Sequence, residues 1–143
     1  DNTARILDVK YYVLLPRSDP VGGDVDIQQW TMILRAASAH RSYRHVYHDR
    51  FKPFNIAEFL ILKREMPRSL AYCHDWIDET TTQLEEIYGE RALCHDAVDR
   101  MGKTLFSQSM EAIFRDGLHE FLADYIAQNN AVAGAIADSY NFH

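Results

Sequence analysis

Apolar residues recur every three to four positions along almost the whole chain, with polar residues between them. This is the spacing of one face of an α-helix, and no stretch of any length shows the strict alternation typical of a half-buried strand. The pattern therefore predicts an all-α fold, a helical bundle of about six helices, that forms a single domain over residues 1–143.

Proline, glycine and capping residues divide this pattern into six segments. Proline disfavours helical geometry in the residue before it, and glycine accepts the left-handed backbone conformation that ends many helices. Breaks are expected at Pro16–Gly23, residues 48–54, Pro67, Gly89 and Asp116-Gly117. The predicted helices are Asp1 to Leu15, Asp24 or Asp26 through Val46, Asn55 to Pro67, Arg68 or Ser69 to Gly89, about Glu90 to Phe114, and Leu118 to about Tyr140.

Five large apolar residues of these stripes are predicted to lie in the core. Trp30, Phe59 and Leu60 belong to the second and third predicted helices. Phe121 and Leu122 are expected to close the bundle from the last helix.

The composition fits one compact soluble domain. Of 143 residues, 47% are hydrophobic and 25% are charged, which is more apolar material than a disordered chain carries. No apolar run approaches the roughly 18 residues of a membrane span, and the chain does not open on a signal-peptide pattern. With 2 cysteines, a fold stapled by disulfides is disfavoured. We therefore expect a cytoplasmic protein without membrane contact.

Charge is divided unevenly along the chain, whose formal net charge is −6. Residues 35–68 hold eight Lys and Arg against three acids, and residues 75–99 hold eight acids against one Arg. Such a division is typical of an anion-facing surface, or of two faces that pair within or between chains. The acidic overall balance argues against a dedicated nucleic-acid binder, which needs a strongly basic footprint.

A Cys-His-Asp tripeptide followed three residues later by Asp occurs twice, as Cys73-His74-Asp75 with Asp78 and Cys94-His95-Asp96 with Asp99. The histidine and the second aspartate share a helical face, so two such helices side by side offer ligand types for a divalent metal. We prefer the simpler interpretation, in which each cysteine is a small core residue and each His-Asp pair is solvated. It predicts that no metal is bound and that His74 and His95 are at least partly exposed. A redox pair of the two cysteines has less support, because nothing marks either thiol as activated.

Short catalytic motifs add little. The chain has no phosphate-binding glycine loop, no dinucleotide fingerprint and no nucleophile elbow. His119-Glu120 begins like a zinc-protease helix, but Ala123 stands where the second histidine is needed. A general acid or base role for this pair stays open, as does a purely structural role for Glu120 at a helix start.

Seven polar residues are the best remaining candidates for a functional site. Arginine suits bidentate recognition of carboxylate or phosphate, and a helix start at Ser69 would add backbone N–H donors. In the structural alternative, Arg5 and Arg68 tie helix ends together through buried ion pairs with Asp8 or Glu58. The candidates are Arg5, Asp8, Arg64, Arg68, Ser69, His119 and Glu120.

Several short motifs occur in a characteristic order: Asp1–Tyr12, Gln29-Trp30, Leu34–Ala39, Tyr43-Arg44-x-x-Tyr47, Ala57–Leu62, Pro67–Leu70 and Gly117–Leu122. In this order they resemble the bacterial alpha-E domain proteins, all-helical proteins with a Glu-Arg motif. The matches correspond to the carboxy-terminal half of a protein about twice this length. We therefore expect the Glu-Arg motif and the amino-terminal half to be absent from this chain, so that any site the motif builds is incomplete.

The resemblance implies a role by association. Alpha-E proteins accompany, or are fused to, a circularly permuted ATP-grasp protein, with transglutaminase-like relatives nearby. This company implies ATP-dependent amide-bond formation on a peptide. We expect a non-catalytic accessory or scaffold protein without a cofactor, whose partners are an ATP-grasp-type protein and a transglutaminase-like protein. Two alternatives stay open: a catalytic subunit that uses the polar candidates, and a metal-binding helical bundle.

The first predicted helix also suggests self-association. No initiator methionine precedes it and its pattern is running by Ala4, so we expect a helix entered part-way. A bundle without the half that should pack beside it leaves apolar surface uncovered, and such surface usually marks an interface. We expect a homodimer through Ile6 to Leu15, with Tyr11 and Tyr12 supplying large contact area.

Overall fold

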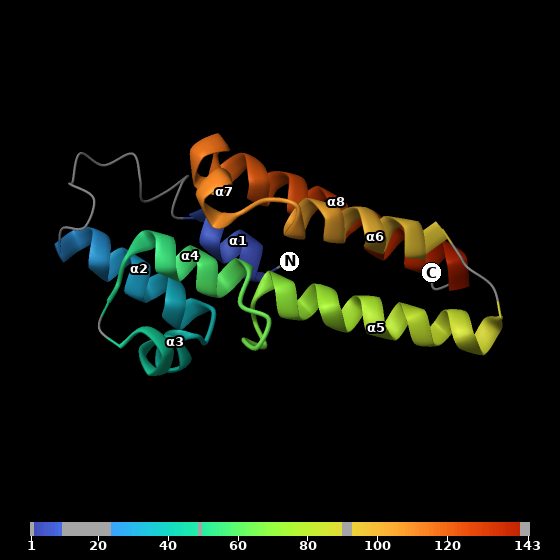
Figure 1. The fold of residues 1–143 in the computed structure, drawn as a ribbon, viewed down its shortest axis with the longest axis horizontal. Coiled ribbons are helices and arrows are strands. Elements are labelled where there is room, and N and C mark those ends of the chain that lie inside the picture. Colours follow the sequence, from blue (N-terminus) through green and yellow to red (C-terminus); the bar gives the residue numbers. More distant parts are fainter. Residues whose placement is uncertain (1, 10–23, 49, 90–92, 141–143) are drawn as a thin grey trace.

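The computed structural model describes residues 2–9, 24–48, 50–89 and 93–140, and these ranges contain eight α-helices and no strand (Figure 1). The all-α prediction is confirmed, whereas the expected number of about six helices is too low. The helices are α1 (Asn2–Val9), α2 (Asp24–Ala36), α3 (His40–Tyr47), α4 (Pro53–Ile61), α5 (Leu70–Tyr88), α6 (Leu93–Phe106), α7 (Met110–Asp116) and α8 (Leu118–Tyr140).

The second predicted helix is interrupted at Ser38, which separates α2 from α3. Ser38 adopts a left-handed conformation with φ of 54°. The N–H of Ala39 donates to the carbonyl of Leu34 at 2.7 Å, and the N–H of Ser38 donates to that of Arg35 at 2.9 Å. This pair of bonds is a Schellman motif, which satisfies the last carbonyls of a helix. Glycine is the usual residue in this left-handed conformation, so the serine at position 38 did not predict a break in the helix.

The fifth predicted helix is also divided, into α6 and α7. Ser109 has an extended backbone and its side chain accepts a hydrogen bond from the N–H of Ala112 at 3.2 Å. A serine in this role is an N-cap, which starts a new helix. The sequence pattern runs through this point because α7 continues to place apolar residues, Met110 and Ile113, in the core.

Most other boundaries agree with the sequence. Gly89 ends α5 in a left-handed conformation with φ of 73°, and Gly117 ends α7. α4 begins earlier than expected, with Pro53 in its first turn rather than with Asn55 as a cap. It is nevertheless shorter than expected, because it ends at Ile61 rather than at Pro67. The break expected at Pro16–Gly23 lies outside the described residues.

Two groups of helices meet at α1. The long helices α5, α6 and α8 extend side by side to one end of the molecule, and α2, α3 and α4 occupy the other (Figure 1). The short α1 packs against α8 from the first group and against α2 and α4 from the second. Residues at the ends of α1 are therefore placed at the junction of the two groups.

One continuous cluster of buried apolar residues runs through both groups. The five predicted core residues are confirmed as members: Trp30, Phe59, Leu60, Phe121 and Leu122. Leu7 is fully buried in the same cluster, so this part of the segment expected to form a dimer packs inside its own bundle. Tyr11 and Tyr12 lie outside the described residues. None of the helices in the described ranges combines the length and the apolar character that a membrane crossing requires.

Candidate functional site

Asp8 and His119 come together across the junction, although 111 positions separate them in sequence. Nδ1 of His119 lies 2.8 Å from Oδ1 of Asp8, and since a carboxylate only accepts, the imidazole donates. Both side chains are partly buried, with 15% of Asp8 and 29% of His119 exposed. The pair ties the end of α1 to the first turn of α8, where a negative charge is also favoured by the helix dipole.

Arg68 and Ser69 lie where α5 begins beside α1. Ser69 is fully buried, and its hydroxyl accepts from the N–H of Tyr72 at 3.0 Å and donates to the carbonyl of Lys63. The predicted helix start at Arg68 or Ser69 is confirmed, and the structure shows that Ser69 is the N-cap. The hydroxyl of Thr3 donates to the carbonyl of Arg68 at 2.7 Å, while the side chain of Arg68 is exposed along a hollow of about 510 Å³.

Arg64 is directed to the long helices instead. Its Nη1 lies 2.8 and 2.7 Å from the two carboxylate oxygens of Asp75 on α5. Its guanidinium carbon lies 4.1 Å from the centroid of the Phe106 ring on α6, a cation–π arrangement. This side chain therefore links the connection after α4 to both helices.

The last two candidates are exposed. Glu120 folds back over Gly117, where an added methyl group would lie only 2.0 Å from its Oε2. Arg5 is exposed on α1. The seven candidates thus do not converge on one site, although a hydrogen bond joins the side chains of Asp8 and His119.

The two histidines of the repeated Cys-His-Asp stretches are buried, contrary to expectation: 6% of His74 and 4% of His95 is exposed. Nε2 of His74, on α5, lies 3.0 Å from the carbonyl oxygen of Val98 on α6. Nε2 of His95, on α6, lies 2.7 Å from the carbonyl oxygen of Thr81 on α5. Because carbonyls accept, each imidazole donates to the opposite helix, and these reciprocal bonds allow both rings to be buried among acidic neighbours.

The same stretches place their thiols differently. Cys94 is buried, as predicted, and Cys73 is half-buried. Within the ranges that the structure describes, no three His, Cys, Asp or Glu side chains are grouped so that they can share a metal ion.

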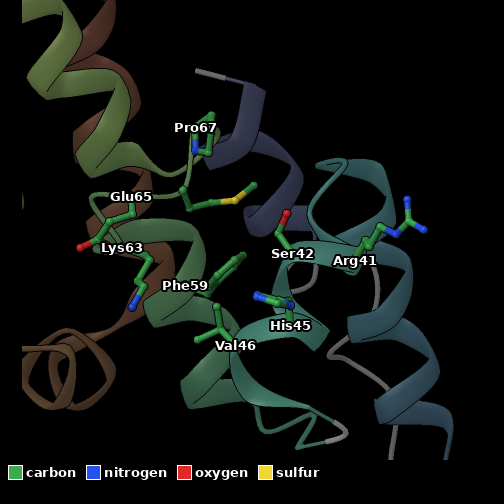
Figure 2. Close-up of a pocket in the computed structure, with 9 residues that line it drawn as sticks. Arg41, Ser42, His45, Val46, Phe59, Lys63, Glu65 and Pro67 are labelled. Carbon is green, nitrogen blue, oxygen red and sulfur yellow. The ribbon is translucent and has the colours of Figure 1, made fainter.

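A hollow of about 410 Å³ opens between α3, α4 and the connection from α4 to α5 (Figure 2). Its floor is apolar, since Phe59 and Met66 are almost fully buried beneath it. Ser42 and His45 face it from α3, and its volume is within the usual range for small-ligand sites. The full lining is Arg41, Ser42, His45, Val46, Phe59, Lys63, Glu65, Met66 and Pro67.

Phe59 is held in place by two tyrosines of α3. The rings of Tyr43 and Tyr47 pack edge-on against it, with centroid distances of 5.5 and 5.8 Å. Burial raises the pKa of Tyr43 to about 12, and burial followed by the nearby Glu58 carboxylate raises the pKa of Tyr47. Both phenols therefore stay neutral, and the floor of the hollow is a fixed aromatic cluster.

A second hollow, of about 540 Å³, adjoins the first because Arg41 and His45 line both. Among the described residues, those that line it are all histidine or arginine: His40, Arg41, Arg44, His45 and His48. Burial and then the charges of Arg35 and Arg44 lower the pKa of His40. The two hollows together, here called the α3 groove, join an apolar half to a cationic half.

The sequence indicated this groove only as the basic excess of residues 35–68. None of its lining residues was among the seven candidates. A signal was present, because His40–His48 holds three histidines and two arginines within nine residues. A solvated helix face has the same composition, so the fold was needed to show that an apolar hollow lies beside it.

The model of one protein family matches residues 1–140, which is nearly the whole chain. That family is Alpha-E, described as a predicted alpha-helical domain with a conserved ER motif. Neither the curated proteins nor the solved structures include a significant match to the chain.

Proposed function

Because the chain belongs to the Alpha-E family, we propose that it is a non-catalytic helical scaffold for a system that synthesises or modifies peptides. In this proposal its partners are an ATP-grasp-type protein, which forms amide bonds at the expense of ATP, and a transglutaminase-like protein. The choice of partners rests on the membership of this family. The scaffold role rests on the contacts that polar residues make between helices.

The observation that supports a scaffold is that four of the seven candidate residues make contacts at helix junctions. His119 bonds Asp8 between α8 and α1, and Ser69 caps α5 from a buried position. Arg64 links α5 and α6 through Asp75 and Phe106. Side chains that position helices in this way build a rigid surface for a partner, and the α3 groove remains open on that surface.

The test uses the purified chain and the ATP-grasp-type protein of the same genome. Sedimentation velocity of the mixture should show a complex heavier than either protein, and the chain alone should consume no ATP. Peptide ligation by the ATP-grasp-type protein should increase when the chain is added. Independent sedimentation with unchanged ligation contradicts the proposal.

The hydrogen bond between Asp8 and His119 favours one second candidate, a catalytic subunit. An imidazole oriented by a carboxylate is a common general base, because the carboxylate stabilises the imidazolium that forms. His119→Gln separates the two roles. A scaffold keeps its ability to bind the partner and to stimulate ligation, whereas a catalytic subunit still binds but loses product formation.

A further inference from the structure

The α3 groove has two halves of different chemistry side by side. The apolar half is built on Phe59 and Met66, and the cationic half contains Arg41 and Arg44. His45 lines both halves, so one ligand can reach across the boundary. In Figure 2, His45 is directed toward Phe59, and Arg41 lies at the opposite side of the opening from Lys63.

Charge restricts what the groove can hold. Within the described part of the lining of the two hollows, Glu65 is the one carboxylate, against Arg41, Arg44 and Lys63. An anionic ligand suits the charge of this lining, and the hollow over Phe59 suits an apolar group on the same ligand. Arginine binds carboxylates through paired N–H groups, which suits the side chains of glutamate and aspartate.

We propose that the α3 groove binds an acidic peptide segment, with one apolar side chain in the hollow over Phe59 and Met66 and its carboxylates against Arg41 and Arg44. This inference rests on the proposed function, which supplies a peptide as the class of ligand. The groove then presents the peptide to the ligase that the scaffold carries.

The adaptability of the floor fits a peptide of variable sequence. Met66 is unbranched and fills irregular space, so it accommodates different aliphatic side chains. Phe59 stays fixed by Tyr43 and Tyr47, which gives the apolar pocket a constant depth. The cationic half selects charge rather than shape, because Arg41 and Arg44 are exposed.

Nucleic acid fits the groove less well. A phosphate backbone would use the cationic half but leave the apolar half empty. The acidic residues of α5 and α6 also repel a polyanion that extends beyond the groove, whereas a short peptide stays within it.

The experiment is a fluorescence anisotropy titration at physiological salt with fluorescein-labelled Glu-Glu-Leu-Glu-Glu-Ala. The chain should bind this probe and should bind the analogue with serine in place of leucine at least fivefold more weakly. Arg41→Glu combined with Arg44→Glu should weaken binding at least tenfold. The matched control is Arg100→Glu with Lys103→Glu, two exposed cations at the same spacing on α6, which should change binding less than twofold.

A further variant isolates the apolar half. Val46 lines this half and is 43% exposed, so Val46→Trp can fill the hollow without disturbing the core. In this variant the leucine and serine peptides should bind equally. Circular dichroism of every variant checks that the helices are intact.

Several outcomes overturn the inference. The first is that the probe does not bind even at millimolar concentration of the chain, and the second is that both double variants lose the same binding affinity. The third is that the original chain binds the leucine and serine peptides equally well. The fourth is that it binds a single-stranded RNA hexamer more tightly than the probe. If the scaffold complex forms but the probe does not bind, the inference alone fails. If the probe binds and no complex forms, the proposed function fails and the peptide site stands.

Discussion

The imidazole of His74 occupies the space where a side chain at position 102 would lie. A methyl group on Gly102 would come within 2.8 Å of both Cε1 and Nε2 of that ring. Nε2 is the atom that bonds the carbonyl of Val98, one helical turn before Gly102. Phe106 packs edge-on against the same ring with a centroid distance of 5.5 Å, so the imidazole has little room to move.

We expect Gly102→Ala to lower the free energy of unfolding by about 1–3 kcal/mol, the usual cost of overpacking a well-packed core. The ring must move, and its hydrogen bond to Val98 is strained or lost. Urea titration followed by circular dichroism measures the change.

Gly134→Ala is the matched control. Gly134 lies in α8 with nothing within 4 Å of an added methyl group. Alanine should therefore stabilise the protein there by about 0.5–1 kcal/mol, because glycine is the poorer helix former. If both substitutions raise stability, the contact between His74 and Gly102 has been misread.

The same contact predicts an energetic coupling. In a His74→Ala background, Gly102→Ala should cost nothing or stabilise, because the ring that it would strike is gone. A double-mutant cycle should give a coupling of about 1–3 kcal/mol, within the range seen for residues in contact. Additive effects of the two substitutions would show that the contact with the His74 ring does not cause the loss of stability in Gly102→Ala.

The helical class, the five core residues and the breaks at Gly89 and Gly117 were predictable from the sequence, because each rests on a local rule of periodicity or backbone conformation. The breaks at Ser38 and Ser109 were not. Serine is common in helices and in caps, and only the surrounding hydrogen bonds show which role it takes here. Local sequence does not contain that information.

The candidate site was less predictable, because it depends on contacts between distant segments. Asp8 and His119 were both selected, but their pairing follows from the way α8 packs against α1. His74 and His95 were expected in solvent since their sequence neighbours are acidic, and the opposite helix supplies the carbonyls that bury them. The groove on α3 needs Phe59 and Met66 from other segments.

Two serine caps of different burial predict different costs. Ser69 is fully buried and makes two hydrogen bonds, so Ser69→Ala leaves the Lys63 carbonyl without this donor and should cost about 1–3 kcal/mol. Ser109 is exposed and accepts one, so Ser109→Ala should cost about 0.5–1 kcal/mol. Thermal and urea unfolding compares both variants under identical conditions. Equal losses of stability would show that the hydrogen bond from Ser69 to the Lys63 carbonyl adds no stability.

Two buried tyrosines predict a loss of stability at alkaline pH. Burial raises the pKa of Tyr43 to about 12, and burial raises the pKa of Tyr125 as well. An unfolded tyrosine titrates near pH 10, about where model compounds do. Between about pH 10 and 12 the unfolded state therefore releases protons that the folded state keeps.

The sign follows from proton linkage, since stability falls with pH wherever the folded state binds more protons. The free energy of unfolding should show no contribution from these tyrosines below about pH 9 and a steady decline above about pH 10. Tyr125→Phe keeps the ring that packs in the core but removes its ionisable group, so this variant should decline less steeply. Urea titrations at pH 8, 10 and 11 give the slopes. A variant that declines as steeply as the original chain would show that Tyr125 ionises as readily in the folded state as in the unfolded one.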